Sequence, residues 1–110
     1  MPTTYKVLGQ AALTAETATD VYAVPADTQA IVSTVVIANR AAVSNTYRIA
    51  IRPSGASLAN EHYISYDVPI TGSDSTTITI GITLGATDVV TVYGGAGSSL
   101  SVSVFGSEIS

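Results

Sequence analysis

The chain has 110 residues, of which 46% are hydrophobic and only 11% charged, and its formal net charge is −4. Soluble domains carry about 25% charged residues, so this chain has few groups with which to decorate a solvent-exposed surface. The length suits one domain over residues 1–110.

The composition also excludes several classes of function. Four basic residues are too few to follow a nucleic-acid backbone, so no nucleic-acid partner is expected. Cysteine is absent, which excludes a disulfide framework, thiolate metal sites and a cysteine nucleophile. No apolar run approaches the roughly 20 residues of a membrane span, and the N-terminus lacks the features of a signal peptide. We therefore expect cytoplasmic synthesis and no membrane partner.

Extended segments are predicted at residues 5–12, 17–24 and 28–39 in the first part of the chain. Gly9 interrupts the first segment and marks a bulge or a close backbone approach. Residues 25–27, Pro-Ala-Asp, supply turn chemistry between the second and the third. Because residues 28–39 are apolar on both faces, we expect a central strand or one that meets another subunit.

The middle of the chain alternates between strands and turns. Tyr47, Ile49 and Ile51 alternate with polar side chains, which predicts a strand with one solvated face. The turn formers of residues 53–60 predict an irregular loop. Residues 62–68 alternate again, and Pro69 is expected to end that strand.

The most regular pattern lies at residues 74–84. Its isoleucines and Leu84 recur at every second position, with threonine or glycine between them. Alternation with period two is typical of a half-buried strand, because successive side chains point to opposite faces. We expect Ile80 at the centre of this pattern to lie in the core.

Two more strands are expected at residues 89–93 and 100–104, joined by a glycine-rich tip at 94–98. About eight short strands joined by Gly, Pro and Asp turns are typical of an antiparallel β-sandwich or a jelly-roll-like arrangement. No longer segment shows apolar period 3.6, so the fold class is all-β with essentially no helix.

No catalytic, cofactor or metal site is predicted. His62 is the only histidine, and Glu61 and Asp67 alternate away from it on an extended chain. The glycines of residues 94–97 lack the strand, helix and lysine of a phosphate-binding loop. Four aspartates are expected to cap turns: Asp20, Asp27, Asp74 and Asp88.

Tyrosine is the one conspicuous aromatic, with six Tyr against one Phe and no Trp. Its apolar ring and polar tip suit both subunit interfaces and sugar-stacking platforms. Tyr63 is the candidate surface contact, because Ser65 and Asp67 share its predicted face. Packing in a core or an interface is favoured over contact with a glycan.

Segments 21–34, 47–53, 61–67 and 84–93 resemble small all-β virion proteins of tailed bacteriophages. In that family, a Tyr-x-Val-Pro-Ala-x-Thr segment leads into an apolar strand followed by Asn-Arg, as residues 22–40 do here. The resemblance implies a non-enzymatic structural protein of the virion, made in the host cytoplasm, with a capsid decoration or cement subunit as the leading interpretation. A tail, baseplate or fibre component is the alternative.

The resemblance also implies the partners. Decoration proteins sit on the capsid lattice, usually as trimers, so copies of the chain itself and the major capsid protein are the expected partners. Self-association would cover apolar surface that few charges protect. From another class of function, a carbohydrate-binding β-sandwich with a tyrosine platform is the alternative.

Overall fold

The structure is a computed structural model that describes residues 2–110; Met1, the first residue of the expected domain, lies outside this range. Its eight strands are β1 (Thr3–Ala12), β2 (Ala18–Ala23), β3 (Gln29–Asn39), β4 (Asn45–Arg52), β5 (Tyr63–Ile70), β6 (Ser75–Leu84), β7 (Val89–Gly94) and β8 (Leu100–Ile109). The helical elements are two three-residue 3-10 turns, Pro53–Gly55 and Asn60–His62. The expected all-β class is confirmed.

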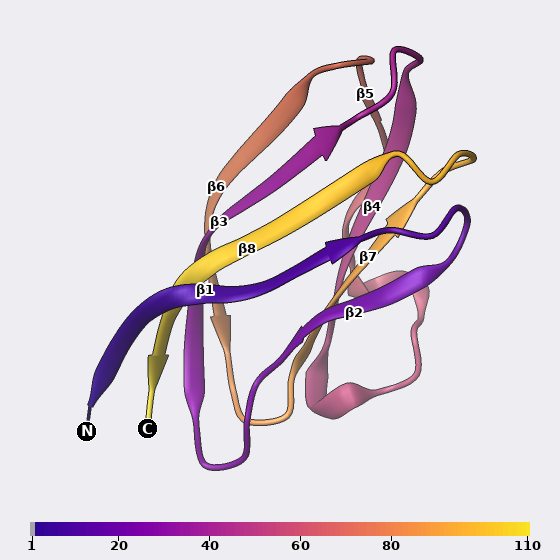
Figure 1. Ribbon diagram of the computed structural model, residues 1–110. Coiled ribbons are helices and arrows are strands. Elements are labelled where there is room, and N and C mark those ends of the chain that lie inside the picture. Colours follow the sequence, from indigo (N-terminus) through magenta and orange to yellow (C-terminus); the bar gives the residue numbers. More distant parts are fainter. Residues whose placement is uncertain (1) are drawn as a thin grey trace.

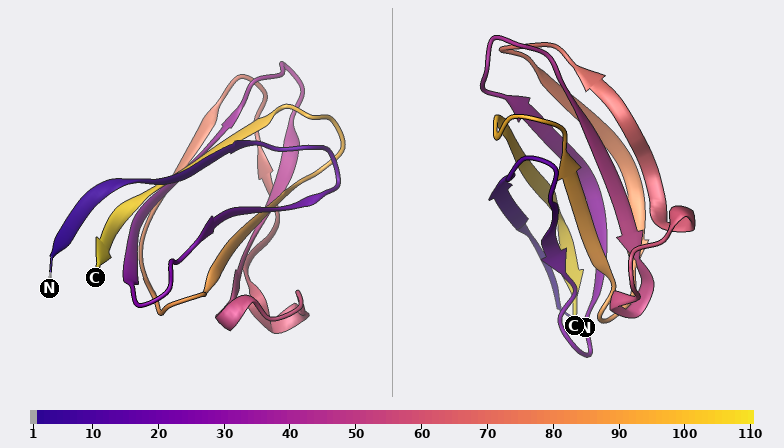
Figure 2. Two further views of the ribbon diagram at one scale, coloured as in Figure 1. Left: turned by 60° about the horizontal axis from the view of Figure 1, so that its bottom comes forward. Right: turned by 90° about the vertical axis from the view of Figure 1, so that its right-hand side faces the viewer.

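The strands form two four-stranded antiparallel sheets, which Figure 1 and the two further views of Figure 2 show as two layers. Sheet A has the order β1-β8-β3-β6, and sheet B has the order β2-β7-β4-β5. This interleaving of strands from the two ends of the chain is the connectivity of a jelly roll. The apolar strand β3 lies inside sheet A, between β8 and β6, as its pattern predicts.

The core lies between the sheets and is built from alternate residues of each strand. On β8, Val102 and Val104 are buried. On β3, Val35 and Ile37 are paired with them and are also buried. From sheet B the core receives Tyr22, Tyr47, Ile49, Val90 and Val92. These contacts fix which face of each strand points inward, because a slip of one residue would turn every side chain over.

Sheet A bends along a line of register shifts that crosses its strands. The pairing skips a residue at Leu8 on β1 and at Ser33 on β3, and two residues of β6, Ile80 and Gly81, oppose Ser33. Such bulges bend and twist a strand. Gly106 of β8 lies at this bend, where an added Cβ would be 2.0 Å from the carbonyl oxygen of Ile31. Only glycine fits there.

The bend overturns one prediction from the alternation of residues 74–84. Ile80 sits in the bulge and is 38% exposed, whereas Ile78 and Ile82 pack against the core. An unbroken period of two would have buried all three. The pattern predicted the strand correctly, but the bulge that moves Ile80 out of the core depends on the neighbouring strands.

Two other predictions concern single residues. Pro69 does not end its strand, because β5 continues to Ile70 and Pro69 pairs with Thr46. This is possible because β5 is an edge strand and needs no N–H donor on its free side. At Gly9 the predicted bulge and close approach are both confirmed: the pairing shifts there, and an added Cβ would lie 2.1 Å from the carbonyl oxygen of Val21.

Candidate functional site

The outer face of sheet A, pointing away from sheet B, is the most unusual surface of the molecule. Cross-strand pairs place these side chains on it: Thr3, Tyr5, Val7, Gln10 and Ala12 of β1; Ser101, Ser103, Phe105, Ser107 and Ile109 of β8; Gln29, Ile31, Thr34, Val36 and Ala38 of β3; Ser75, Thr77, Thr79 and Thr83 of β6. None of these positions, all within residues 2–110, carries a charge. We call this surface the uncharged face.

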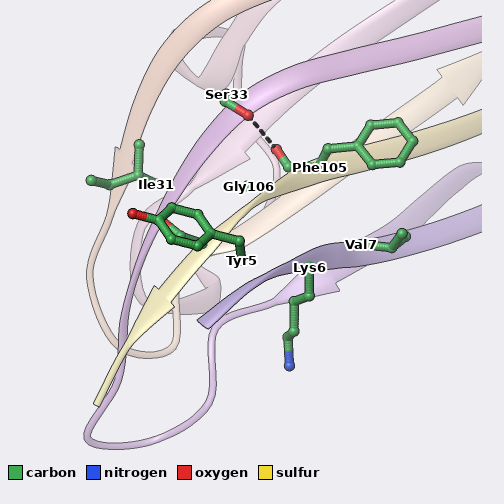
Figure 3. A pocket seen from close by; sticks show the side chains of 8 residues that line it. Tyr5, Lys6, Val7, Ile31, Ser33, Phe105 and Gly106 are labelled. Atoms are coloured by element: carbon green, nitrogen blue, oxygen red, sulfur yellow. Dashed lines mark hydrogen bonds between the residues drawn. The ribbon is translucent and has the colours of Figure 1, made fainter. Parts of the chain in front are cut away.

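An open groove of about 640 Å³ runs along the bent part of the uncharged face. Tyr5, Val7, Ile31 and Phe105 give it an apolar lining, and Tyr5 is 84% exposed. Figure 3 shows the Tyr5 ring extending toward Ile31, with Lys6 directed away from the ring. The Ser33 hydroxyl donates to the Phe105 carbonyl oxygen at 3.3 Å across the register shift. A partner that fills this groove would remove much apolar surface from water.

One charged residue, Lys6, also lines the groove, but its ammonium group forms an ion pair on the opposite side of the sheet. Lys6 Nζ is 2.8 Å from Glu108 Oε1, and the Tyr22 hydroxyl donates to Glu108 Oε2 at 2.5 Å. Hydrogen bonds from Lys6 and Tyr22 lower the pKa of Glu108, whereas burial, together with this carboxylate, raises the pKa of Tyr22. The carboxylate therefore stays ionised and ties β1, β8 and β2 together.

The outer face of sheet B has a different character, because ion pairs and aromatic rings cover it. Arg48 Nε donates to Asp67 Oδ1 at 2.6 Å. The Arg48 guanidinium carbon lies 4.1 Å from the ring centroid of Tyr66 and 4.4 Å from that of Tyr93. Such contacts between a cation and aromatic faces are attractive. The hydrogen bond from Arg48 to Asp67 is the main cause that raises the pKa of the Arg48 guanidinium.

A second charged group lies beside the first. Arg52 Nη2 donates to Asp20 Oδ1 at 2.8 Å, and Arg52 Nε donates to the Thr91 hydroxyl at 3.0 Å. The Thr91 hydroxyl donates in turn to Asp20. Asp20 therefore does not cap a turn, as expected from sequence, but pairs across β7 with an arginine of β4, two strands away in sheet B.

The predicted contact residue, Tyr63, lies at this same face. It is half-buried, and its ring meets that of Tyr66 edge-on with centroids 4.9 Å apart. Tyr66 is the more open ring, at 55% exposed. A bulge at Tyr66 and Asp67, opposite Arg48, brings both side chains to the arginine. Sequence alternation could not find this arrangement, because the bulge interrupts it.

The remaining candidates have structural roles. His62 Nδ1 accepts a hydrogen bond from the Ala59 N–H at 3.0 Å and so closes a 3-10 turn. Asp88 accepts from the N–H groups of Gly85 and Ser54, which joins a tight turn to the loop after β4. Asp74 accepts from the N–H of Ser75 beside its own turn. Among residues 2–110, no cluster of three or more His, Cys, Asp or Glu side chains is placed to hold a metal ion.

Within residues 2–110, no helix has the length and apolar character needed to cross a membrane.

Comparison with solved structures finds a likeness to a viral chain. No protein-family model matches the chain, and no curated protein sequence matches it. A chain in "Structure of infectious bursal disease virus Gx strain" superposes on 97% of this chain with a TM-score of 0.49 and 10% sequence identity. The match covers 30% of that viral chain, so the present chain spans about a third of its length. At this identity and TM-score, the match assigns no function.

Proposed function

We propose that this chain is a non-enzymatic structural protein of a bacteriophage virion, and that it acts as a decoration or cement subunit of the capsid. The observation that carries the proposal is the uncharged face of sheet A, with its apolar groove and the 84% exposed Tyr5. The resemblance to small phage virion proteins gives independent support. In this proposal the mature protein is located in the virion.

The uncharged face suits permanent contact with another protein. Interfaces are depleted of charged residues at their centre, because each buried charge must be desolvated. The hydroxyl and amide side chains of the uncharged face can be buried without desolvating a charge, and its apolar groove offers surface that a partner would remove from water. No side chain on this face carries a charge that would have to be desolvated. Docking onto the capsid would therefore bury apolar surface at little electrostatic cost.

The major capsid protein is the partner that we propose for this face, and a tail or fibre protein is the alternative. A direct test is immunogold labelling of purified particles of the phage that encodes the chain. Label distributed over the shell supports decoration, and label confined to the tail supports the alternative. Particles without any label, or a gene outside a phage structural cluster, would contradict a virion role.

A second candidate function rests on the other face of the molecule. Tyr66 presents an open ring beside Arg48 and Asp67, and sugar sites combine aromatic stacking with planar charged groups. A glycan array probed with the chain and with Tyr66→Ala tests this candidate. We expect no signal from either protein, because Arg48 already occupies one side of the ring. A hit that Tyr66→Ala removes would favour the carbohydrate-binding module.

A further inference from the structure

The molecule has four sheet edges, belonging to β1 and β6 in sheet A and to β2 and β5 in sheet B. An exposed edge offers unpaired N–H and C=O groups to other chains, and proteins usually block it with charges, prolines, bulges or covering segments. In this chain, three of the four edges are blocked in one of these ways.

β1 and β2 shield each other where Gly9 approaches the Val21 carbonyl. Lys6 protects the rest of β1, because it points inward to Glu108 and would place a charge in any added pairing. β5 carries Pro69 and two register shifts, and Asp67 within it has a positive φ of 51°. None of these three edges offers a straight run of free backbone groups.

β6 lacks such protection over its first half. Residues 75–79 read Ser-Thr-Thr-Ile-Thr, without proline, glycine or charge, and their pairing with β3 is regular up to Thr79. β-branched, uncharged segments of this kind pair readily with other strands. The bulge at Ile80 and Gly81 ends the regular run.

The free backbone groups of β6 can be assigned from its pairing with β3. The Asn39 N–H donates to the Asp74 carbonyl at 2.8 Å, so Asp74 belongs to a hydrogen-bonded pair. Hydrogen-bonded and free residues alternate along an antiparallel strand. The N–H and C=O groups of Ser75, Thr77 and Thr79 therefore point away from β3 toward the open edge, and their side chains lie on the uncharged face.

We propose that β6 is a self-association seam, in which two copies of this chain pair antiparallel about a twofold axis at Thr77. This register opposes Thr77 to its own copy and Ser75 to Thr79 of the partner, so that all three free residues are used. Three hydrogen-bonded pairs give about six new hydrogen bonds. Every pair on the outer side joins two hydroxyl side chains, and no like charges meet.

A second copy is the occupant that the molecule itself indicates. Because the other three edges are blocked, β6 is the strand of this chain best able to complete β6 of another. A twofold axis perpendicular to the sheet also keeps both uncharged faces on the same side. Four strands of about ten residues present about 600 Å² on one face, given the spacing of strands and residues. The uncharged face of one copy is thus smaller than the roughly 800 Å² that each partner buries in a standard interface, whereas the joined faces of two copies are larger.

This inference deepens the proposed function, from which it takes the idea that the chain works as an assembly. It differs from the trimer that the resemblance implies, since a twofold seam joins two copies. The trimer stays a prediction, and the mass of the assembled protein distinguishes a dimer from a trimer.

The test uses the absence of cysteine from the chain. In the proposed register, Thr77→Cys brings two thiols together across a hydrogen-bonded pair, at a Cα separation of about 5.5 Å that a disulfide accepts. Ser75→Cys places its thiols about 13 Å apart, four residues along the strand. Thr3→Cys, on the other edge of sheet A, is the matched control. Under mild oxidation we expect a crosslinked dimer from Thr77→Cys alone.

A second variant tests the seam without a crosslink. Thr77→Pro removes an N–H that points to the open edge, so the fold should survive and the pairing should be lost. Light scattering coupled to size exclusion should give twice 11.2 kDa for the unmodified chain and 11.2 kDa for Thr77→Pro. Equal masses for the two proteins, a threefold mass, or crosslinking of Thr3→Cys at the rate of Thr77→Cys would overturn the seam. A monomer that still labels the capsid would overturn the seam alone, and a dimer absent from particles would overturn the proposed function alone.

Discussion

The outer faces of the two sheets differ in where this chain places its few charges. Arg48, Arg52, Asp20 and Asp67 pair on the outer face of sheet B, whereas the corresponding face of sheet A carries none among the described residues. Both faces are open to water in a single copy. Ion pairs make the first face a natural water-facing surface, whereas the second has no charge and an apolar groove, as a surface that another protein covers would have.

The difference also explains the composition of the chain. A domain with 11% charged residues cannot charge its whole surface. The remaining charges lie in turns and at the inward-facing pair of Lys6 and Glu108. The absence of charge is therefore confined to the outer face of sheet A, and it indicates that this face meets the partner in the assembly.

The largest effect is expected from neighbouring residues on the two sides of β3. Ile37 is fully buried, and Val36 beside it lies on the uncharged face. Ile37→Lys would bury an unpaired charge at a cost of several kcal/mol, comparable with the total stability of a domain, so the variant should not fold. Val36→Lys should cost about 1 kcal/mol or less but block docking on the capsid.

Circular dichroism and co-sedimentation with particles assembled without the chain check this pair. Ala18→Lys, an exposed position on β2 in sheet B, controls for an added charge. The comparison of faces would fail if Val36→Lys bound particles as well as Ala18→Lys does.

The next effect concerns the bend that shapes the groove of sheet A. Gly106→Ala places a methyl group against the Ile31 carbonyl, 2.0 Å from its oxygen, and should destabilise the fold by about 3 kcal/mol or more because backbone must move. Gly81→Ala, in the β6 bulge of the same bend, meets nothing within 4 Å. Urea unfolding should show a large loss for the first and little change for the second. Similar losses for both would mean that the close approach of β8 and β3 does not restrict residue 106.

A smaller effect distinguishes the inward charges of sheet A by pH. The pKa of Glu108 is lowered in the folded state by Lys6 and Tyr22, so its contribution to stability is complete above its unfolded pKa of about 4.3. That contribution is lost as pH falls through the lower folded pKa. Urea unfolding at neutral and acid pH should therefore show a smaller acid-induced loss for Glu108→Gln than for the unmodified chain. Glu61→Gln, at an exposed position of the 3-10 turn Asn60–His62, is the control substitution. An unchanged acid-induced loss in Glu108→Gln would contradict the role of this carboxylate.

The smallest effect is expected on the outer face of sheet B. Arg48→Ala removes the ion pair with Asp67 and the contacts with Tyr66 and Tyr93. Exposed ion pairs contribute up to about 1 kcal/mol, and an exposed cation–π contact about as much. We expect a loss of about 1–2 kcal/mol in chemical unfolding with no loss of particle binding. Failure of Arg48→Ala to bind particles would assign the docking role to the wrong sheet.

Much of the fold could be predicted from the sequence, because alternation at residues such as Tyr47, Ile49 and Ile51 follows from the geometry of a strand. Alternation is a local signal, and it fails where pairing partners impose a bulge. The environments of Ile80 and Asp67 differ from the predicted ones for that reason, because each residue lies in a bulge. The uncharged face could not be predicted from local sequence patterns either, because its residues become neighbours only when β1, β8, β3 and β6 are placed in register.

The asymmetry of the faces is tested most directly by two exposed tyrosines. Tyr5 is 84% exposed on the uncharged face, and Tyr66 is 55% exposed on the outer face of sheet B. Hydroxyl-radical footprinting with mass spectrometry compares their oxidation in the free chain and in purified virions. We predict that assembly protects Tyr5 and leaves Tyr66 reactive; unchanged oxidation of Tyr5, or protection of Tyr66 in its place, would contradict the account.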